Sequence, residues 1–508
     1  MRADNYSVLI SVPHGAAAGN MLRTGIVRRV IEADPRVHVA IVSPMAGDPE
    51  FVREVAHPRV SVEPLPPHRP AGLEARLLAL MQAAYVDSGI TESVRIRRME
   101  AQEKGTIRWI GLKRRIAQVL TPSMVERPTR YDLSDRLVSH PWAEALFDRH
   151  RPVMLVTSSP GLILSEVPLL RTAARRQVWS MAIDPSWDNF TNKLLPVRRV
   201  NRLIVWNDLM RRQAMQLHGY DEGDIRVAGT PQWDRYFHDG VTVSRREFCD
   251  RVGADPDRKL LTLTTTPREL YPHHDHVLRT LLAAMREGRF REPVQVLVRL
   301  HPRDDRSHYA EFEHVPGVIL EKPFRETVKA GDGLSVDVTA ASQQHLADTL
   351  YHSDVIINVA STIAIEAAIF DTPVVNVSFD GPSESPFARS AKRYYRFTHY
   401  VNITRHDAVR VAATPDGLIA EINRYLGDPS LDRDGRRKVV QEQCQFSDGR
   451  AAERVAEAVV EDLRFVTSRD SATTHEGRSL SADTSRVAPE TAAVPQLKPG
   501  RAYGSEQR

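Results

Sequence analysis

The chain has 508 residues, a formal net charge of +4, and hydrophobic and charged shares of 42% and 26%. A single core stops growing near ~250 to 300 residues, so this length predicts two cores. The composition is that of a soluble globular protein, and no apolar run approaches the ~20 residues of a membrane helix, which argues against an integral membrane protein. The small net charge gives little support to nucleic-acid binding, and we expect no nucleic-acid partner.

The first segment, MRADNYSVLISVPHG, leads directly into a strand-like run without the basic, apolar and small-residue zones of a secretory signal. We therefore expect a cytoplasmic protein, with peripheral attachment to the inner face of the membrane left open. The two cysteines, Cys249 and Cys444, form neither a CxxC pair nor a disulfide framework, and we interpret both as ordinary thiols.

Strand-like apolar runs alternate with helix-length stretches in the first half of the chain. This alternation is the βαβ signature and predicts a doubly wound parallel sheet. The interval of about 71–142 is longer than one crossover needs and predicts a helical insertion. The strand-like runs are residues 7–12, 39–43, 153–157, 178–183 and 203–206.

A second series of strand-like runs follows the segment IRVAGTPQWDRYF, so the sequence predicts two similar α/β domains that face each other, residues 1–236 and 237–448. Residues 449–465 carry apolar side chains at helical spacing and predict a closing helix. Residues 466–508 are too polar to offset the entropy of ordering and predict a disordered tail. The second series comprises residues 260–265, 294–300, 318–320, 355–359 and 374–377.

Residues 95–115, RIRRMEAQEKGTIRWIGLKRR, mix basic and apolar side chains inside the predicted insertion. One interpretation is a solvated helix face. The other is a basic amphipathic surface for an anionic membrane or an anionic lipid-linked acceptor, since each Lys or Arg near such a surface contributes about 1 kcal/mol.

The segment NVASTIAIEAAIFDTPVVNVSFD, residues 358–380, predicts a strand end, a helix and a second strand. A helix that begins after a parallel strand offers unpaired amides and a positive dipole end to anions. Ser361 and Thr362 stand at that helix start, where their hydroxyls suit a phosphate, and Glu366 lies one turn deeper, where a carboxylate can accept ribose hydroxyls. The alternative is a plain helix cap at Ser361 and an arginine partner for Glu366.

Two further strand ends of the second series carry polar groups. VLVRLHPRDD ends in Arg299 and His301, which suit phosphate oxygens, and TLTTTPREL brings Thr265, Thr266 and Arg268, which suit a diphosphate. The His can instead bond a backbone carbonyl. The adjacent carboxylates of Asp304 and Asp305 have no spaced partner, so we predict a solvated turn and no metal site.

The first strand of the chain is followed by SVPHGAAAGNMLRTG, which has neither the GxGxxG nor the GxxxxGK[ST] order. His14 is placed at the mouth of the sheet, where an imidazole can remove a proton from an acceptor hydroxyl or serve only a structural role. We assign Gly15 and Asn20, which follow it, to acceptor binding.

The segment IDPSWDNFTNK, residues 183–193, also ends a strand and concentrates polar groups around an aromatic ring. Such a group is typical of a sugar or polyol site, although an Asn/Asp-rich turn packed on a tryptophan is the alternative. We assign Asp184 and Asp188 to catalysis, and Trp187, Asn189 and Lys193 to acceptor binding.

Three stretches, GTPQWD (229–234), LHPRDD (300–305) and SDVIINVASTIAIEAAIFDTPVV (353–375), resemble the GT-B nucleotide-sugar glycosyltransferases. More narrowly, they resemble the branch of the CDP-glycerol glycerophosphotransferases and the UDP-N-acetylglucosamine 2-epimerases. The phosphotransferases commonly have Asp-Tyr-Ser-Ser where this chain has Asn358 to Ser361. The resemblance implies two Rossmann-like domains around a cleft, the acceptor in the first and the donor nucleotide in the second, with no bound metal or other cofactor.

The resulting hypothesis is a transferase that moves a glycosyl or glycerophosphate-type group from a nucleotide-sugar or CDP-alcohol donor to an acceptor hydroxyl. We expect a polysaccharide or lipid-linked acceptor and a role in cell-surface or capsular polysaccharide synthesis. A nucleotide-sugar 2-epimerase and a non-catalytic nucleotide-sugar-binding protein with a degenerate site are the alternatives. Nucleic-acid binding through residues 95–115 ranks last and would show as salt-sensitive affinity.

Overall fold

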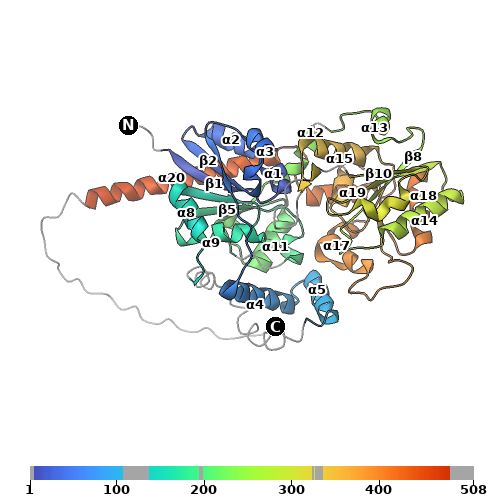
Figure 1. The fold of residues 1–508 in the computed structure, drawn as a ribbon, viewed down its shortest axis with the longest axis horizontal. Helices are drawn as coiled ribbons and strands as arrows, with labels where there is room; N and C mark the ends of the chain where they lie inside the picture. The colour runs from blue at the N-terminus through green and yellow to red at the C-terminus, as the bar shows by residue number, and fades with distance from the viewer. Residues whose placement is uncertain are drawn as a thin grey trace, which may run out of the picture. The chain divides into compact units, whose positions relative to one another are not determined.

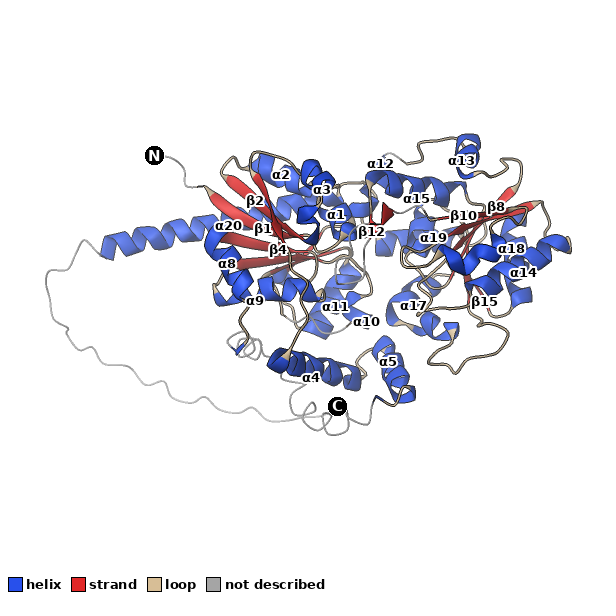
Figure 2. Cartoon of the chain, viewed as in Figure 1, coloured by secondary structure: helices blue, strands red, loops and turns tan. Residues whose placement is uncertain are grey.

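The computed structural model describes residues 5–106, 137–193, 198–238, 240–322, 325–326 and 336–480. Residues up to Leu463 form one compact unit. Two parallel sheets with helices on both faces dominate this unit, one in each half of the chain (Figures 1 and 2). The predicted class, α/β with two doubly wound sheets, is confirmed.

The N-terminal sheet has seven parallel strands in the order β3-β2-β1-β4-β5-β6-β7. Its strands are β1 (Tyr6–Ser11), β2 (Val37–Ser43), β3 (Val60–Pro64), β4 (Pro152–Thr157), β5 (Trp179–Ile183), β6 (Arg202–Val205) and β7 (Ile225–Val227). Its helices are α1 (Gly15–Met21), α2 (Ile26–Ala33), α3 (Pro49–Glu54), α8 (Pro141–His150), α9 (Val167–Arg175), α10 (Asn189–Asn192) and α11 (Asp208–His218). Every strand run predicted in this half is present, the edge strand β7 opens the segment IRVAGTPQWDRYF, and the edge strand β3 is additional.

The C-terminal sheet has six strands in the order β10-β9-β8-β13-β14-β15. They are β8 (Lys259–Thr264), β9 (Val294–Arg299), β10 (Val318–Glu321), β13 (Val355–Asn358), β14 (Val374–Val377) and β15 (Arg410–Ala412). A separate pair joins β11 (Arg325–Glu326) to β12 (Val336–Asp337). The helices of this half are α12 (Asp234–His238), α13 (Arg245–Val252), α14 (His274–Arg286), α15 (Ala340–His352), α16 (Ile363–Ile369), α17 (Thr398–Thr404), α18 (Pro415–Gly427) and α19 (Arg433–Gln443). The predicted strand, helix and strand of residues 353–375 are β13, α16 and β14.

The alternation of side chains along β1 shows how the N-terminal sheet is buried on both faces. Val8 and Ile10 pack with α1 and α2, whereas Leu9 packs on the opposite face with α8 and α9. Because successive side chains point to opposite faces, a continuous apolar strand needs a helix layer on each side. The Leu9 face belongs to a core that continues through Trp206 and Tyr236 into the C-terminal half.

The predicted helical insertion contains α4 (Gly72–Ser88) and α5 (Glu92–Glu103). Residues 107–136, which include the second part of the basic segment, lie outside the described residues. Helix α5 lies beside α17 of the C-terminal half (Figure 1), and the amide of Thr398 donates to Oγ of Ser93 over 2.8 Å. An N-terminal helix therefore contacts the C-terminal half directly.

The closing helix is α20 (Ala451–Leu480), which extends beyond the predicted end at residue 465. The two carboxylate oxygens of Asp234 accept hydrogen bonds from the amides of Ala451 and Ala452 and so cap its start. Val455 and Val459 pack against the N-terminal sheet. Residues 481–508 of the predicted tail lie outside the described residues. No helix in the described ranges combines the length and the apolar character that crossing a bilayer requires.

Candidate active site

A cavity of about 870 Å³ lies between the two sheets, and most of its lining residues come from the loops that follow the strands. Its walls follow the carboxyl ends of β5, β8, β9, β13 and β14, where ligands of open α/β sheets bind. Helix α5 and the end of the β5 loop supply Arg97, Glu100, Lys104, Asp188, Asn192 and Lys193. The C-terminal half supplies Arg268, Glu269, Leu270, Pro272, His273, Arg303, Ala360, Ser385, Ala388, Arg389, Arg393, Tyr394, Phe397 and His399.

Basic side chains predominate in this cavity, because its wall contains only Glu100, Asp188 and Glu269 as acidic groups. Within the described residues, the side chains of Lys104, Arg268 and Arg303 form no ion pair, and basic side chains outnumber acidic ones along the cavity wall. A concave site with uncompensated positive charge attracts anions, and guanidinium groups bind phosphate oxygens well. The cavity therefore suits a phosphorylated ligand.

Asp188 is the predicted catalytic residue that lines the cavity. Its Oδ1 accepts a hydrogen bond from Oγ of Ser186, and Nζ of Lys193 lies 3.4 Å away. Burial opposes the ionisation of Asp188, but the positive charge of Lys193, the nearby His399 and the hydrogen bonds outweigh it and lower the pKa of Asp188. The cavity wall thus carries an ionised carboxylate at neutral pH.

His399 lines the cavity on the C-terminal side, opposite the β5 loop. Its ring packs edge-on against Trp187 with a centroid separation of 5.0 Å. Burial lowers the pKa of His399 to about 4, although the charge of Asp188 acts in the opposite direction. A neutral imidazole therefore stands near the Asp188 carboxylate, and Trp187 serves to pack this corner rather than to line the cavity.

Asp184 and Asn189, at the start of the same loop, are buried instead of lining the cavity. Oδ1 of Asp184 accepts hydrogen bonds from the amide of Ser186 at 3.0 Å and from Nδ2 of Asn189 at 2.7 Å. Burial raises the pKa of Asp184 to about 7. The two groups hold the loop together, and their predicted catalytic and acceptor roles stay predictions.

The segment after β1 is used to begin a helix. His14 is the N-cap of α1, and its Nδ1 accepts a hydrogen bond from the amide of Ala17 at 3.1 Å. Gly15 is the first residue of the helix, and Asn20 lies in its last turn. None of the three is among the residues that line the cavity, so the predicted general-base and acceptor roles stay predictions.

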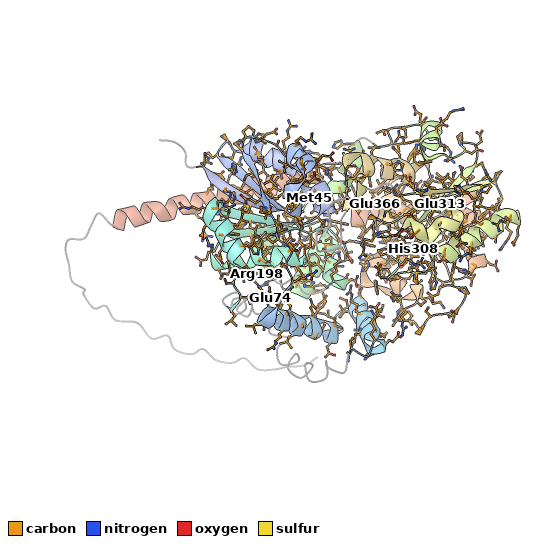
Figure 3. The ribbon with its side chains drawn as sticks, in the orientation of Figure 1. Met45, Glu74, Arg198, His308, Glu313 and Glu366 are labelled. Atoms are coloured by element: carbon orange, nitrogen blue, oxygen red, sulfur yellow. The ribbon has the colours of Figure 1, made fainter. Side chains whose placement is uncertain are left out.

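The N-terminus of α16 adjoins the cavity through Ala360, which has a positive φ of 42°. Ser361 and Thr362 follow it, and Oγ of Ser361 accepts a hydrogen bond from the amide of Ile363 at 3.3 Å. Glu366, labelled in Figure 3, is 8% exposed and accepts a hydrogen bond from the hydroxyl of Tyr236 at 2.7 Å. Burial raises the pKa of Glu366 to about 7, although the Tyr236 bond and Arg299 lower it.

The loops after β8 and β9 support each other, because the amide of His301 donates to Oγ1 of Thr265 at 2.9 Å. The amide of Thr266 donates to Nε2 of His274 at 2.8 Å. Arg299 pairs with Glu321 and is buried, whereas Arg268 is exposed and lines the cavity. Of the side chains predicted to hold a donor, only Arg268 lines the cavity, and the others stand at the strand ends behind it.

Several cavity residues were not predicted as site residues. Arg303 follows the predicted His301 by two positions, and its basic character next to a strand end was the available signal. Arg389, Arg393 and His399 lie in a long segment after β14 without a recognisable motif. Their approach to the cavity depends on tertiary packing, and no pattern in the sequence indicates it.

A buried carboxyl group between β4 and α9 was also missed. Glu166 accepts hydrogen bonds from the amide of Ser158 at 2.8 Å and from Oγ of Ser159 at 2.7 Å. Burial raises the pKa of Glu166 to about 7, although these bonds lower it. The group organises the loop after β4, and the run of hydroxyl residues at 157–159 was the only sequence signal.

Comparisons with known proteins support the fold. A putative UDP-N-acetylglucosamine 2-epimerase from Listeria monocytogenes has a TM-score of 0.51 at 13% identity, over 91% of this chain and 97% of that chain. S. aureus MnaA, in a co-structure with UDP, has a TM-score of 0.52 at 12% identity, over 91% of this chain and 98% of that chain. At such low identity the likeness extends to the fold alone.

Sequence comparison gives a curated relative and a family. Lipid-A-disaccharide synthase of Geobacter sulfurreducens is 31% identical over 259 residues, which are 48% of this chain, and the chain spans 59% of the relative's length. The family model described as CDP-glycerol:poly(glycerophosphate) glycerophosphotransferase matches residues 168–461. This match takes in the C-terminal sheet, the β5 loop with Asp188 and more than half of the chain. The chain therefore belongs to the CDP-glycerol:poly(glycerophosphate) glycerophosphotransferase family.

Proposed function

We propose that this protein transfers a glycerophosphate-type or glycosyl group from a nucleotide-activated donor to an acceptor hydroxyl. The observation that carries the proposal is the basic cavity between the two sheets, whose Lys104, Arg268 and Arg303 side chains form no ion pair within the described residues. Family membership supports the same reaction class. The reaction belongs, in this proposal, to the synthesis of a cell-surface polymer.

The donor occupies the C-terminal side of the cavity in this proposal. Its phosphates lie against Arg268 and Arg303, with Ser361 and Thr362 at the adjoining helix mouth. Oε2 of Glu366 is taken by Tyr236, and Oε1 would serve a ribose hydroxyl. In either version of the reaction, negative charge accumulates on the departing nucleotide phosphate. Positioned guanidinium groups stabilise such charge in the transition state.

The acceptor approaches from the N-terminal side, where Asp188 stands in the cavity wall. In the transition state the ionised carboxylate of Asp188 accepts the proton of the attacking hydroxyl, which raises the nucleophilicity of its oxygen. With a CDP-alcohol donor the oxygen attacks phosphorus and CMP leaves. With a nucleotide sugar it attacks the anomeric carbon and a nucleoside diphosphate leaves.

The proposal requires no cofactor and no metal ion in the cavity, because the basic side chains supply the charge neutralisation that a metal ion gives in other phosphoryl transferases. A lipid-linked or polysaccharide acceptor and attachment at the inner face of the membrane complete the proposal. The basic segment, residues 95–115, contributes Arg97 and Lys104 to the cavity wall, and its proposed further role is contact with an anionic membrane surface.

The first test is binding of UDP, GDP, CDP, CMP and dTDP, measured by thermal unfolding of the full chain. A nucleotide at 100 times its Kd should stabilise the protein by about 2.7 kcal/mol. We expect a cytidine nucleotide to give the largest shift, and the shift to disappear in the double variant R268A/R303A. Absence of any nucleotide-dependent shift would contradict the proposal.

Turnover distinguishes the transferase from its alternatives. With the responding donor, the transferase should release nucleotide only when an acceptor polyol or glycan is added. An epimerase would interconvert a UDP-sugar without an acceptor, and a degenerate binding protein would bind nucleotide without turnover. R306A provides a matched control, because Arg306 is exposed, pairs with Glu313 and does not line the cavity.

A further inference from the structure

Three side chains with metal-ligand chemistry converge at the base of the helical insertion. His68 precedes α4, Glu74 lies in its first turn (Figure 3), and His140 is the N-cap of α8. One nitrogen or oxygen atom from each lies within 4.8 Å of the others. Nε2 of His68 is 3.1 Å and Nε2 of His140 is 3.7 Å from Oε1 of Glu74. We refer to these three residues as the His68-Glu74-His140 cluster.

A second observation points to a missing ligand at this cluster. Within the described residues, Nε2 of His140 has no hydrogen-bond partner although the residue is only 7% exposed. Buried polar atoms in folded proteins are almost always satisfied, so an unpartnered imidazole nitrogen requires an explanation. This nitrogen belongs to the same triangle of ligand atoms as Glu74 and His68.

We propose that the His68-Glu74-His140 cluster binds a divalent transition metal ion of the zinc type. Two imidazole nitrogens and one carboxylate oxygen are a known donor set for zinc, and also for non-haem iron. An iron site for oxygen chemistry needs open positions. The side chains here are only 12%, 6% and 9% exposed, in the order of the cluster's name, so a substrate has little access to an ion held there, which favours zinc. A water molecule would complete the four ligands.

The protonation states allow this binding without a net change of charge on the protein. Without metal, the His68 ring can donate its Nε2 proton to Glu74. On binding, the proton moves to Nδ1, and both imidazoles coordinate in the neutral form that zinc requires. Arg171 donates to the same oxygen of Glu74, and that carboxylate retains further lone pairs. Arg171 therefore orients the ligand as an outer partner, while its charge weakens metal affinity.

The position of the cluster gives the metal a structural role. His68 and Glu74 lie at the start of the insertion and His140 lies at its end. One bound ion would therefore hold the two ends of the insertion together. Closing a long loop removes much conformational freedom from the unfolded chain. The ion would fix α4, which leads into α5, and α5 carries Arg97 and Lys104 to the active-site cavity.

Metal content of the full chain, free of any affinity tag, tests the proposal. The protein is treated with a chelator, equilibrated with zinc chloride, dialysed, and measured by atomic emission. We expect one tightly held zinc ion per chain and a rise of the melting temperature by a few degrees with zinc. Cobalt in place of zinc should give the visible absorption bands of a tetrahedral site. Zinc content near zero after dialysis would overturn the proposal.

Matched histidine variants locate the ion. H68A/H140A should lose the zinc ion and the cobalt bands, whereas H57A/H314A, which removes the same number of imidazoles from exposed positions, should keep both. If the first variant fails to fold, H68A alone, at the more exposed of the two ligands, should weaken zinc binding at least tenfold. Zinc retained by H68A, or lost equally from H57A/H314A, would show that the ion binds elsewhere.

Discussion

At the carboxyl end of the N-terminal sheet, the carboxyl groups of Glu166 and Asp184 are buried and held by hydrogen bonds from their own loops. At the carboxyl end of the C-terminal sheet, the guanidinium groups of Arg268 and Arg303 stand exposed in the cavity. Burial raises the pKa of the two carboxyl groups to about 7, so they readily take up a proton. The two guanidinium groups stay charged and are exposed to a ligand. The carboxyl edges of two similar sheets therefore differ: polar groups organise loops in the N-terminal half and, in our proposal, bind an anion in the C-terminal half.

Asp188 is the exception in the N-terminal half, and its variant should have the largest effect. D188N keeps the size of the side chain but removes the carboxylate that, in the proposed mechanism, accepts the acceptor's proton, so we expect kcat to fall by ~10² to 10⁴ while the donor Kd changes little. Steady-state turnover and nucleotide titration measure the two quantities.

D184N is the matched control, because Asp184 lies in the same loop but is buried and has a pKa raised to about 7 by that burial. An amide can accept the same hydrogen bonds, so kcat should stay within a fewfold of the wild type. A larger loss of kcat in D184N than in D188N would reverse the contrast between buried and cavity-lining carboxylates.

The second prediction addresses the exposed arginines. A hydrogen bond to a charged group contributes ~1.5 to 3 kcal/mol, so R268A/R303A should weaken donor binding by about a thousandfold. Isothermal titration with the donor nucleotide at fixed ionic strength measures the change. R306A should bind as the wild type does. If R268A/R303A also binds normally, the anion site lies elsewhere than at the mouth of the C-terminal sheet.

Most of the fold could be predicted because its strands are buried on both faces, so that runs such as residues 294–300 and 355–359 are predominantly apolar. The edge strands gave weaker signals. β3 is only partly buried and includes polar residues, and β15 has three residues. Hydrophobic patterning detects apolar runs, and β3 and β15 are too polar or too short to be detected in this way, whereas the edge strand β10 was predicted from its apolar run at residues 318–320.

The site was predicted in part, because strand ends can be located in a sequence but side-chain partners cannot. Asp188, Lys193 and Arg268 lie in the segments that follow β5 and β8, and they do line the cavity. Glu366 also follows a strand, yet its carboxylate is held by Tyr236 from a segment more than a hundred residues earlier. The cavity residues of α5 could not be predicted for the same reason: α5 reaches the cavity only because it packs against α10 and α17, which the sequence does not indicate.

Glu366 is a buried carboxyl group of the C-terminal half whose raised pKa makes stability depend on pH. Its pKa is raised from 4.5 to about 7, chiefly by burial. The folded state therefore holds a proton that the unfolded chain releases, and stability present below pH ~4.5 is lost as the pH rises to about 7. E366Q cannot lose a proton, so at pH 8 it should be more stable than the wild type by up to about 3 kcal/mol.

Urea unfolding at pH 4 and pH 8 measures this difference. The two proteins should be closely matched at pH 4, where the carboxyl group is protonated in both states. Equal stability at pH 8 as well would show that the pKa of Glu366 is not raised in the folded protein. The donor Kd of E366Q tests the proposed ribose contact separately, because an amide oxygen is a weaker acceptor than a carboxylate.

The smallest effect is expected at the ion pairs between α5 and the C-terminal half, such as Arg396 with Glu92 and Arg389 with Glu103. The Arg396 side chain is 59% exposed, and exposed pairs contribute ~0.2 to 1 kcal/mol that salt reduces. R396A should therefore lower the free energy of unfolding by less than about 1 kcal/mol at low salt, and by less again at high salt. Because Arg396 does not line the cavity, donor affinity should stay within about twofold.

A large loss of donor affinity in R396A would mean that the position of α5, and not only the mouth of the C-terminal sheet, determines anion binding. The helical insertion of the N-terminal half would then contribute to anion binding together with the C-terminal sheet.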